Sequence, residues 1–234
     1  MVTTLYLIRH GKTDGGDTKR YHGRIDVPLS PQGADQIRTA SSFVLSRLQD
    51  PAGSKHTSYL RDIHGETGRQ GPGAADTKQG LSAVYTSDLS RAKASAELIA
   101  EPHGRKPVIV PALRERSFGI WEGMTFTEII DRYPAEFQAW ASDPLRFSPL
   151  GGESTREVCD RVIPALDAIV GRHAGEDIAI VAHGGVNRVI LSHVLGMPLE
   201  NIFRIEQEHA AVNIIEFWDR YPVVKLLNGG PQGS

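Results

Sequence analysis

The sequence predicts an α/β fold, a three-layer α/β/α sandwich in which a mostly parallel sheet has helices on both faces and one antiparallel edge strand. Short apolar runs rich in β-formers alternate with longer stretches of helical periodicity, which is typical of parallel sheets. The last two apolar runs, 211–218 and 223–227, are separated only by a turn and alternate in polarity. They indicate a terminal hairpin.

The predicted elements follow in chain order. Strands are expected at 5–8, 81–86, 107–110 and 177–182, where apolar runs end at polar or turn residues. Helices are expected at 31–48, 87–102, 127–132, 135–141, 153–173 and 186–195. Ser30 is placed to cap the first helix with Pro31 at its first position, and its apolar face is Ile37, Ala40, Val44 and Leu48. Gly196 ends the last helix, as expected of a helix C-terminus.

Two segments have too few apolar residues to contribute to a core. Residues from about 50 to 80 are rich in Gly, Ser, Thr, Lys, His and Asp, which predicts a flexible insertion. The Gly-rich tail from about residue 228 is expected to fray. Outside these segments we expect a single domain over 1–234, although the length also allows two small domains.

Composition limits the classes of partner. The chain has 234 residues, 40% of them hydrophobic, with a formal net charge of −2. A nucleic-acid binder needs a basic surface that releases counterions, so this charge argues against that class. Any anion site must be a local cluster of cations.

The sequence predicts a cytoplasmic protein with no membrane partner. No run approaches the roughly 20 apolar residues of a bilayer-spanning helix, and the first residues lack the pattern of a signal peptide. Cys159 is the single cysteine, so no intrachain disulfide can form and a reducing compartment is expected. An edge strand or the terminal hairpin offers a surface for a homodimer.

Polar residues end three of the predicted strands. They are Arg9-His10-Gly11, the segment from Ser87 to Arg91, and His183-Gly184-Gly185. Because ligands of parallel sheets bind outside the carboxyl ends of the strands, two guanidinium groups and two imidazoles are expected to meet there. Such a cluster repels itself unless it holds an anion, and arginine matches phosphate in bidentate fashion.

Backbone groups are expected to support this phosphoryl site. We expect helix N-termini after Gly11 and after Gly185, which would point N–H groups at the anion. The glycines Gly11, Gly184 and Gly185 would let the backbone approach the ligand.

The candidate nucleophile is an imidazole, because these loops contain neither a cysteine nor a P-loop pattern. Neighbouring cations lower the pKa of a histidine and keep it neutral. Phosphoryl transfer to nitrogen followed by hydrolysis is covalent catalysis. A proton donor for the leaving alcohol is still needed, and Glu115, in the charged loop after the third strand, is the first choice.

Taken together, these motifs resemble the histidine phosphatase superfamily, in its phosphoglycerate-mutase-like branch 1. The resemblance lies in Arg9-His10-Gly11, in the segments 87–92 and 115–119, in Gly151-Gly152-Glu153-Ser154 and in His183-Gly184, and spans nearly the whole chain apart from 50–80. It implies that His10 is phosphorylated, that Arg9 and Arg91 hold the phosphoryl oxygens and that His183 stabilises the transferring group. Glu115 would protonate the leaving oxygen and then activate water.

The resemblance also implies a small phosphorylated substrate, no metal and no organic cofactor. Substrate contacts are expected from Gly11, Thr13, His22, Gly23, Arg116 and Gly184. Solvated loop positions remain an equal interpretation for His22, Arg116 and Arg24. Four other histidines, His103, His173, His193 and His209, are expected at packing or surface positions, with His209 as the one to reconsider. Lys12 stands where many relatives have an acidic or amide side chain, and no role follows for it.

Hydrolysis is favoured over mutase activity. Phe126 stands where cofactor-dependent mutases carry a lysine, and Ala141-Ser142 follow Trp140 where they carry an arginine pair. Phe118 and Gly185 replace their usual tyrosine and asparagine. The prediction is a metal-independent phosphomonoesterase acting through phosphohistidine on small metabolites, such as sugar phosphates or α-ribazole phosphate. The alternatives are a cofactor-dependent phosphoglycerate mutase and a silent phospho-ligand-binding module.

Overall fold

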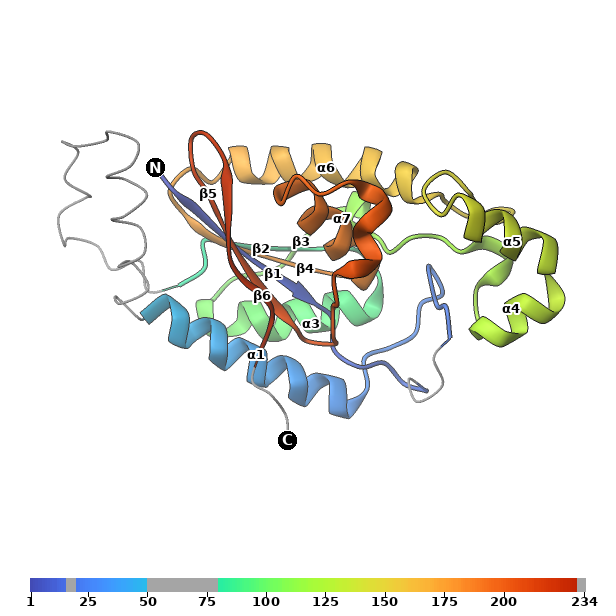
Figure 1. Ribbon diagram of the computed structural model, residues 1–234. Helices are drawn as coiled ribbons and strands as arrows, with labels where there is room; N and C mark the ends of the chain where they lie inside the picture. The colour runs from blue at the N-terminus through green and yellow to red at the C-terminus, as the bar shows by residue number, and fades with distance from the viewer. Residues whose placement is uncertain (16–19, 50–79, 231–234) are drawn as a thin grey trace.

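The computed structural model describes residues 1–15, 20–49 and 80–230, and within them six strands form one sheet (Figure 1). The strands are β1 (Thr3–Arg9), β2 (Ala83–Thr86), β3 (Val108–Ile109), β4 (Asp177–Ala182), β5 (Val212–Phe217) and β6 (Pro222–Gly229), in the order β3-β2-β4-β1-β5-β6. β1 to β4 run parallel, and β5 runs antiparallel to both β1 and β6. The predicted fold class is confirmed, with β5 as the reversed strand and β6 at the edge beyond it.

Two pairs of helices make the outer layers of the sandwich. α1 (Pro31–Gln49) and α3 (Ser90–Ala100) lie on one face of the sheet, and α6 (Thr155–Gly171) and α7 (Gly184–Val194) lie on the other (Figure 1). Short 3-10 helices lie in the connecting segments: η2 (Glu101–His103), η3 (Pro111–Leu113), η4 (Gly119–Trp121) and η5 (Leu199–Arg204).

Alternation along β1 produces a core on each face. Leu5 and Leu7 pack with α6 and α7, whereas Tyr6 and Ile8 pack with α1 and α3. Successive side chains of a strand point to opposite faces, so a strand buried on both sides must be apolar throughout, as this one is.

The predicted face and cap of α1 are confirmed. Ile37, Ala40 and Val44 are fully buried, and Leu48 packs at the margin of the same core. The backbone N–H of Gly33 donates to Ser30 Oγ at 3.0 Å, which satisfies one of the donors that a helix N-terminus leaves free.

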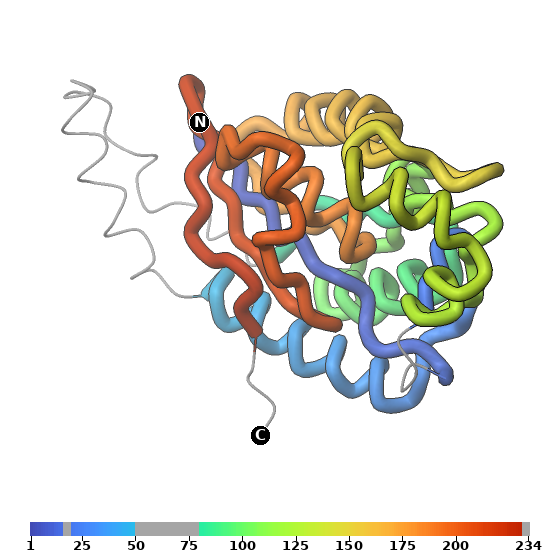
Figure 2. The backbone as a smooth tube through the Cα atoms, turned by 45° about the vertical axis from the view of Figure 1, so that its right-hand side comes forward, coloured from blue at the N-terminus to red at the C-terminus, as the bar shows by residue number. Residues whose placement is uncertain are grey.

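A third pair of helices projects beyond the carboxyl ends of the strands. α4 (Phe126–Arg132) and α5 (Pro134–Ser142) lie there, and the turned view of Figure 2 brings them to the front beside the segment that follows β1. The Tyr21 N–H donates to the Met124 carbonyl at 2.9 Å, and Arg20 forms an isolated β-bridge with Thr125. This segment therefore joins the sheet to the projecting pair.

Two local expectations were wrong. Gly11 is followed by an isolated bridge between Thr13 and Leu29, not by a helix, because α1 starts only at Pro31. The sheet also extends further than expected, since β6 pairs with β5 as far as Gly229. The predicted insertion lies outside the described residues apart from Gly80.

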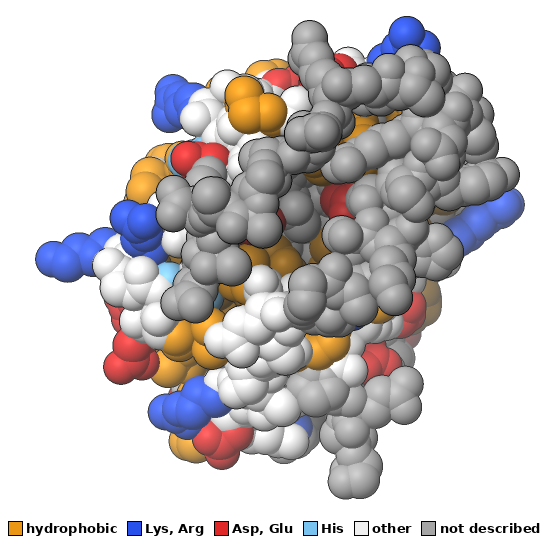
Figure 3. All heavy atoms as spheres, turned by 90° about the vertical axis from the view of Figure 1, so that its left-hand side faces the viewer, with side chains coloured by type: hydrophobic (Ala, Val, Ile, Leu, Met, Phe, Trp, Pro, Cys, Tyr) orange, Lys and Arg blue, Asp and Glu red, His pale blue; other side chains and the backbone are white. Residues whose placement is uncertain are grey.

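At the end of the molecule opposite to α4 and α5, the described surface has no patch of charge of one sign. Figure 3 shows Lys, Arg, Asp and Glu side chains scattered among apolar and neutral groups on the described surface there. Among the described residues, no helix is long and apolar enough to cross a membrane.

Candidate active site

Strand register brings the two predicted histidines together. β1 and β4 pair so that Arg9 lies opposite Ala182, and the His10 N–H donates to the Ala182 carbonyl at 3.0 Å. His10 and His183 therefore leave adjacent strands at the same level. Their ring centroids are 5.2 Å apart in an edge-to-face arrangement.

The His10 imidazole is held in one orientation. Its Nδ1 lies 2.7 Å from the Gly11 carbonyl oxygen, so we assign the ring proton to Nδ1, which leaves the lone pair on Nε2. Burial, followed by His183, Arg9 and Arg91, places the pKa of His10 well below its ordinary value. The ring is thus neutral near pH 7, as a nitrogen nucleophile must be.

Arg9 lies beside His10, and the C-terminal part of the chain holds it. Its Nη1 donates to the Gln207 carbonyl, and its Nη2 lies 3.0 Å from His209 Nε2. Burial lowers the pKa of Arg9 to about 10, so the group stays charged. Its Nε is buried without a hydrogen-bond partner among the described residues, a donor that an anion oxygen would satisfy.

Arg91 comes from the first turn of α3 and is 2% exposed. Its Nη1 and Nη2 donate to the carbonyls of Ile25 and Gly23 at 2.8 and 2.7 Å. Since a guanidinium has five N–H donors, these two bonds fix its plane and leave others for a ligand. Burial lowers the pKa of Arg91, although nearby Glu115 opposes that effect.

His183 is fully buried at the start of α7. Its Nε2 lies 2.8 Å from Ser87 Oγ, so the second of the three predicted strand ends also contributes to the site. Burial, followed by Arg91 and Arg9, places the pKa of His183 well below its ordinary value.

Glu115 reaches the site from the loop after η3. Its Oε2 accepts from the Gly185 N–H at 3.1 Å, and its Oε1 accepts from the Arg116 N–H at 2.8 Å. A Cβ at position 185 would lie only 2.5 Å from Glu115 Oε1. Gly185 is therefore the residue that gives this carboxylate room beside the helix terminus.

All five predicted catalytic side chains come together. Four of them, His10, Arg9, Arg91 and Glu115, line one cavity of about 900 Å³, and the His183 ring contacts that of His10. The cavity walls also include Thr13, His22, Gly23 and Gly184. Among the described residues, no group of three or more His, Cys, Asp or Glu could hold a metal ion.

Two of the predicted substrate contacts, Gly11 and Arg116, also have structural roles. A Cβ at Gly11 would lie 2.3 Å from the Gly33 carbonyl oxygen, so this glycine permits close packing against α1. Arg116 lines the cavity, but its guanidinium donates to the Glu153 and Phe147 carbonyls and to Thr155 Oγ1. Both residues hold loops in place.

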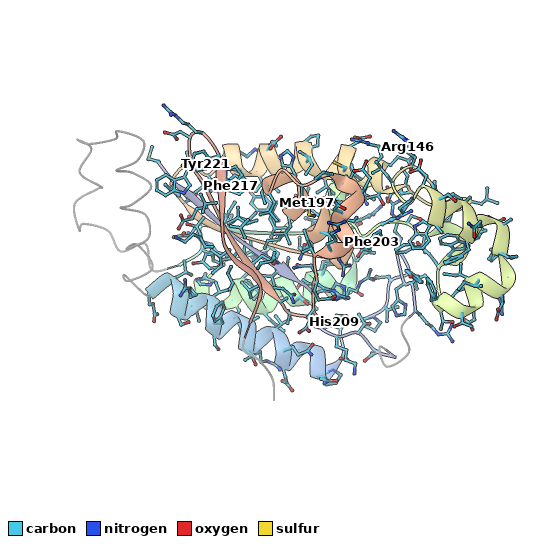
Figure 4. All side chains as sticks on the ribbon, viewed as in Figure 1. Arg146, Met197, Phe203, His209, Phe217 and Tyr221 are labelled. Carbon is cyan, nitrogen blue, oxygen red and sulfur yellow. The ribbon has the colours of Figure 1, made fainter. Side chains whose placement is uncertain are left out.

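The main residue that sequence reasoning misplaced is His209, expected at a packing or surface position. It lines the cavity, contacts Arg9, and its ring centroid is 5.6 Å from that of His10. Figure 4 marks it just before β5, near the end of β1. Its placement depends on the pairing of β5 with β1, which no local motif encodes.

Comparison with known proteins agrees with this geometry. The family model for the histidine phosphatase superfamily (branch 1) matches residues 5–61 and 65–229. Phosphoserine phosphatase 1 of Hydrogenobacter thermophilus is 24% identical over 227 residues, covering 97% of this chain and 92% of that protein. The metal-independent phosphoserine phosphatase of Arabidopsis thaliana is 32% identical over 191 residues, covering 81% and 67%.

A solved structure shares the fold over nearly the full length. Bacillus stearothermophilus YhfR superposes with a TM-score of 0.75 at 28% identity, and 96% of each chain is covered. With the family match, the shared fold and the five assembled side chains, the chain belongs to branch 1 of the histidine phosphatase superfamily.

Proposed function

We propose that this chain hydrolyses monoesters of small phosphorylated metabolites through a phosphohistidine at His10, without a metal. The observation that carries the proposal is the bond from His10 Nδ1 to the Gly11 carbonyl. It leaves a neutral Nε2 as the nucleophile in a cavity that also contains Arg9 and Arg91.

The family supports the reaction class. The chain is a phosphoric monoester hydrolase by its family and by its phosphatase relatives. Two of those relatives are named for phosphoserine, and the plant protein is named metal-independent. Small phosphorylated metabolites are accordingly the substrate class that we propose.

The reaction proceeds in two displacements. His10 Nε2 attacks phosphorus, the bond from phosphorus to the leaving oxygen breaks, and Glu115 in its acid form gives that oxygen a proton. Water then attacks the phosphohistidine while Glu115 takes one of its protons, which releases phosphate and restores His10. The same carboxyl group thus serves as acid and then as base.

Several groups stabilise the negative charge of the transferring phosphoryl group. Arg9 and Arg91 supply guanidinium donors, and the N-terminus of α7, which begins at Gly184, adds the favourable end of its helix dipole. These groups are held by protein contacts before substrate arrives. Donors that are already oriented toward developing charge lower the barrier without reorganisation.

The cavity supports hydrolysis over mutase activity. Phe118 and Phe126 both line it, whereas a bisphosphorylated activator needs a second set of anion contacts. We further propose that the protein acts in the cytoplasm, in keeping with its single cysteine. The edge strand β6 is the surface that we propose for a homodimer.

The test is hydrolysis of p-nitrophenyl phosphate in the presence of a chelator. We expect His10→Ala to lower kcat by about three orders of magnitude or more, because the nucleophile is lost. His193→Ala, an exposed histidine at the end of α7, is the matched control and should behave as wild type. The wild-type protein should also yield an acid-labile phosphoprotein in quenched turnover. Unchanged activity in His10→Ala would refute the mechanism.

A further inference from the structure

One wall of the cavity is aromatic. Phe126 begins α4, Phe137 and Trp140 lie on α5, and Phe203 lies on η5. Consecutive ring centroids are 5.1, 5.5 and 6.2 Å apart. We call these four residues the aromatic wall, and all of them line the same cavity as His10 and Glu115.

The aromatic wall is only partly covered by the protein itself. Phe126 is 46% exposed and Phe203 is 56% exposed, and Figure 4 marks Phe203 on the segment after α7. A cluster of exposed apolar side chains marks a binding surface, and a further aromatic ring can pack against these rings in edge-to-face or offset geometry.

The aromatic wall and the phosphoryl site line the same cavity, and this indicates which part of a substrate the wall contacts. In an in-line displacement the leaving group departs on the side of phosphorus opposite to the nucleophile. The leaving group is therefore the part of a substrate that extends from His10 into the remainder of the cavity, which the aromatic wall bounds.

The other arginines of the cavity each donate to a protein acceptor. Arg20 Nη1 donates to Glu128 Oε2 at 2.8 Å, and three nitrogen atoms of Arg116 each donate to a protein oxygen. Arg188 Nε donates to the Ile205 carbonyl at 2.7 Å. Glu206 also lies 3.7 Å from a guanidinium nitrogen of Arg188. A carboxylate on the leaving group would therefore compete with protein carboxylates for Arg20 and Arg188.

We propose that the aromatic wall binds the leaving group, so that the preferred substrates are phosphate monoesters of alcohols that carry an aromatic ring and no carboxylate. This inference rests on the proposed function, because it concerns the leaving group of the same reaction. The substrate preference that we propose for this chain differs from phosphoserine, the substrate for which two of its relatives are named.

The test compares three alkyl esters: 2-phenylethyl phosphate, ethyl phosphate and phosphoserine. Two methylene groups separate the phenyl ring from the ester oxygen, so a difference between the first two esters reports binding of the ring and not bond reactivity. We expect kcat/KM for 2-phenylethyl phosphate to exceed that for each of the others by about tenfold or more. Equal values for the three esters, or a preference for phosphoserine, would overturn the proposal.

Variants assign the preference to the aromatic wall. Phe126→Ala should lower the ratio of kcat/KM for phenylethyl over ethyl phosphate by about tenfold, and Phe126→Leu should lower it less. Leu195→Ala removes a side chain that is 48% exposed outside the cavity and should leave the ratio unchanged. Phe126→Lys should move the preference toward phosphoserine by supplying a cation. An unchanged ratio in Phe126→Ala would contradict the proposal.

The two proposals fail in different ways. If the proposed function is wrong, the wild-type protein turns over none of the three esters in a manner that depends on His10. If only the leaving-group inference is wrong, His10-dependent turnover is present but does not distinguish the phenyl ester.

Discussion

His209 positions Arg9 through an imidazole nitrogen. Burial, followed by Arg9 and Lys12, lowers the pKa of His209 to about 3, so the neutral Nε2 can accept from Arg9 Nη2 at 3.0 Å. His209→Ala removes the acceptor of a charged hydrogen bond, a loss of roughly 1.5–3 kcal/mol. We therefore expect kcat/KM to fall by about tenfold to a hundredfold, measured on p-nitrophenyl phosphate.

A conservative variant separates positioning from packing. The amide oxygen of His209→Gln can reach the place of Nε2 and should restore most of kcat/KM. If His209→Ala stays within about twofold of wild type, a margin set by the normal spread of surface substitutions, the contact with Arg9 has no role in turnover.

At the N-terminus of α7, Gly185 leaves room for the Glu115 carboxylate but is less favourable in a helix than alanine. A Cβ at Gly185 would contact only the end of a flexible side chain, Glu115 Oε1, at 2.5 Å. Gly185→Ala should therefore fold well, because alanine is favoured over glycine in a helix by about 1 kcal/mol, yet it should displace the carboxylate. We expect kcat to fall by roughly tenfold or more while the Tm is maintained.

A glycine elsewhere in a helix provides the control. Gly171 ends α6, and a Cβ there would meet nothing within 4 Å. Gly171→Ala should maintain the Tm without changing kcat. Equal kcat values for the two alanine variants would show that Glu115 does not need the space that Gly185 leaves.

The folded protein keeps three histidines of the site neutral. The pKa values of His10, His183 and His209 are lowered mainly by burial. Once unfolded, these groups bind protons below about pH 6.5, so the unfolded state binds more protons there and the free energy of unfolding falls as pH falls. Each group contributes at most about 1.4 kcal/mol per pH unit. Urea unfolding at about pH 7.5 and about pH 5.5 should show this loss, above the range in which carboxylates titrate.

The His209→Gln variant serves as the reference for that experiment. With one neutral histidine fewer, its stability should depend less steeply on pH over the same interval. An identical pH dependence in the two proteins would mean that His209 is not held neutral by the fold.

Local patterns predicted most of this architecture because they record what each segment must bury or cap. The apolar run of β1, the apolar face of α1 and the Ser30 cap are properties of neighbouring residues, and each was confirmed. The helix expected after Gly11 was wrong because the glycine there serves contact with Gly33, some twenty residues later in the chain. A glycine alone does not tell whether a ligand or another segment of backbone comes close.

The sequence by itself determined the fold class, the strand ends that carry chemistry and the family, since these depend on short motifs and on the alternation of strands with helices. Tertiary structure alone decided that His209 lies against Arg9, that Arg116 is occupied by Glu153, Thr155 and Phe147, and that α5 and η5 share an aromatic wall. Those contacts join segments far apart in the chain. Strand register and helix packing set them, and neither is written in any one stretch of sequence.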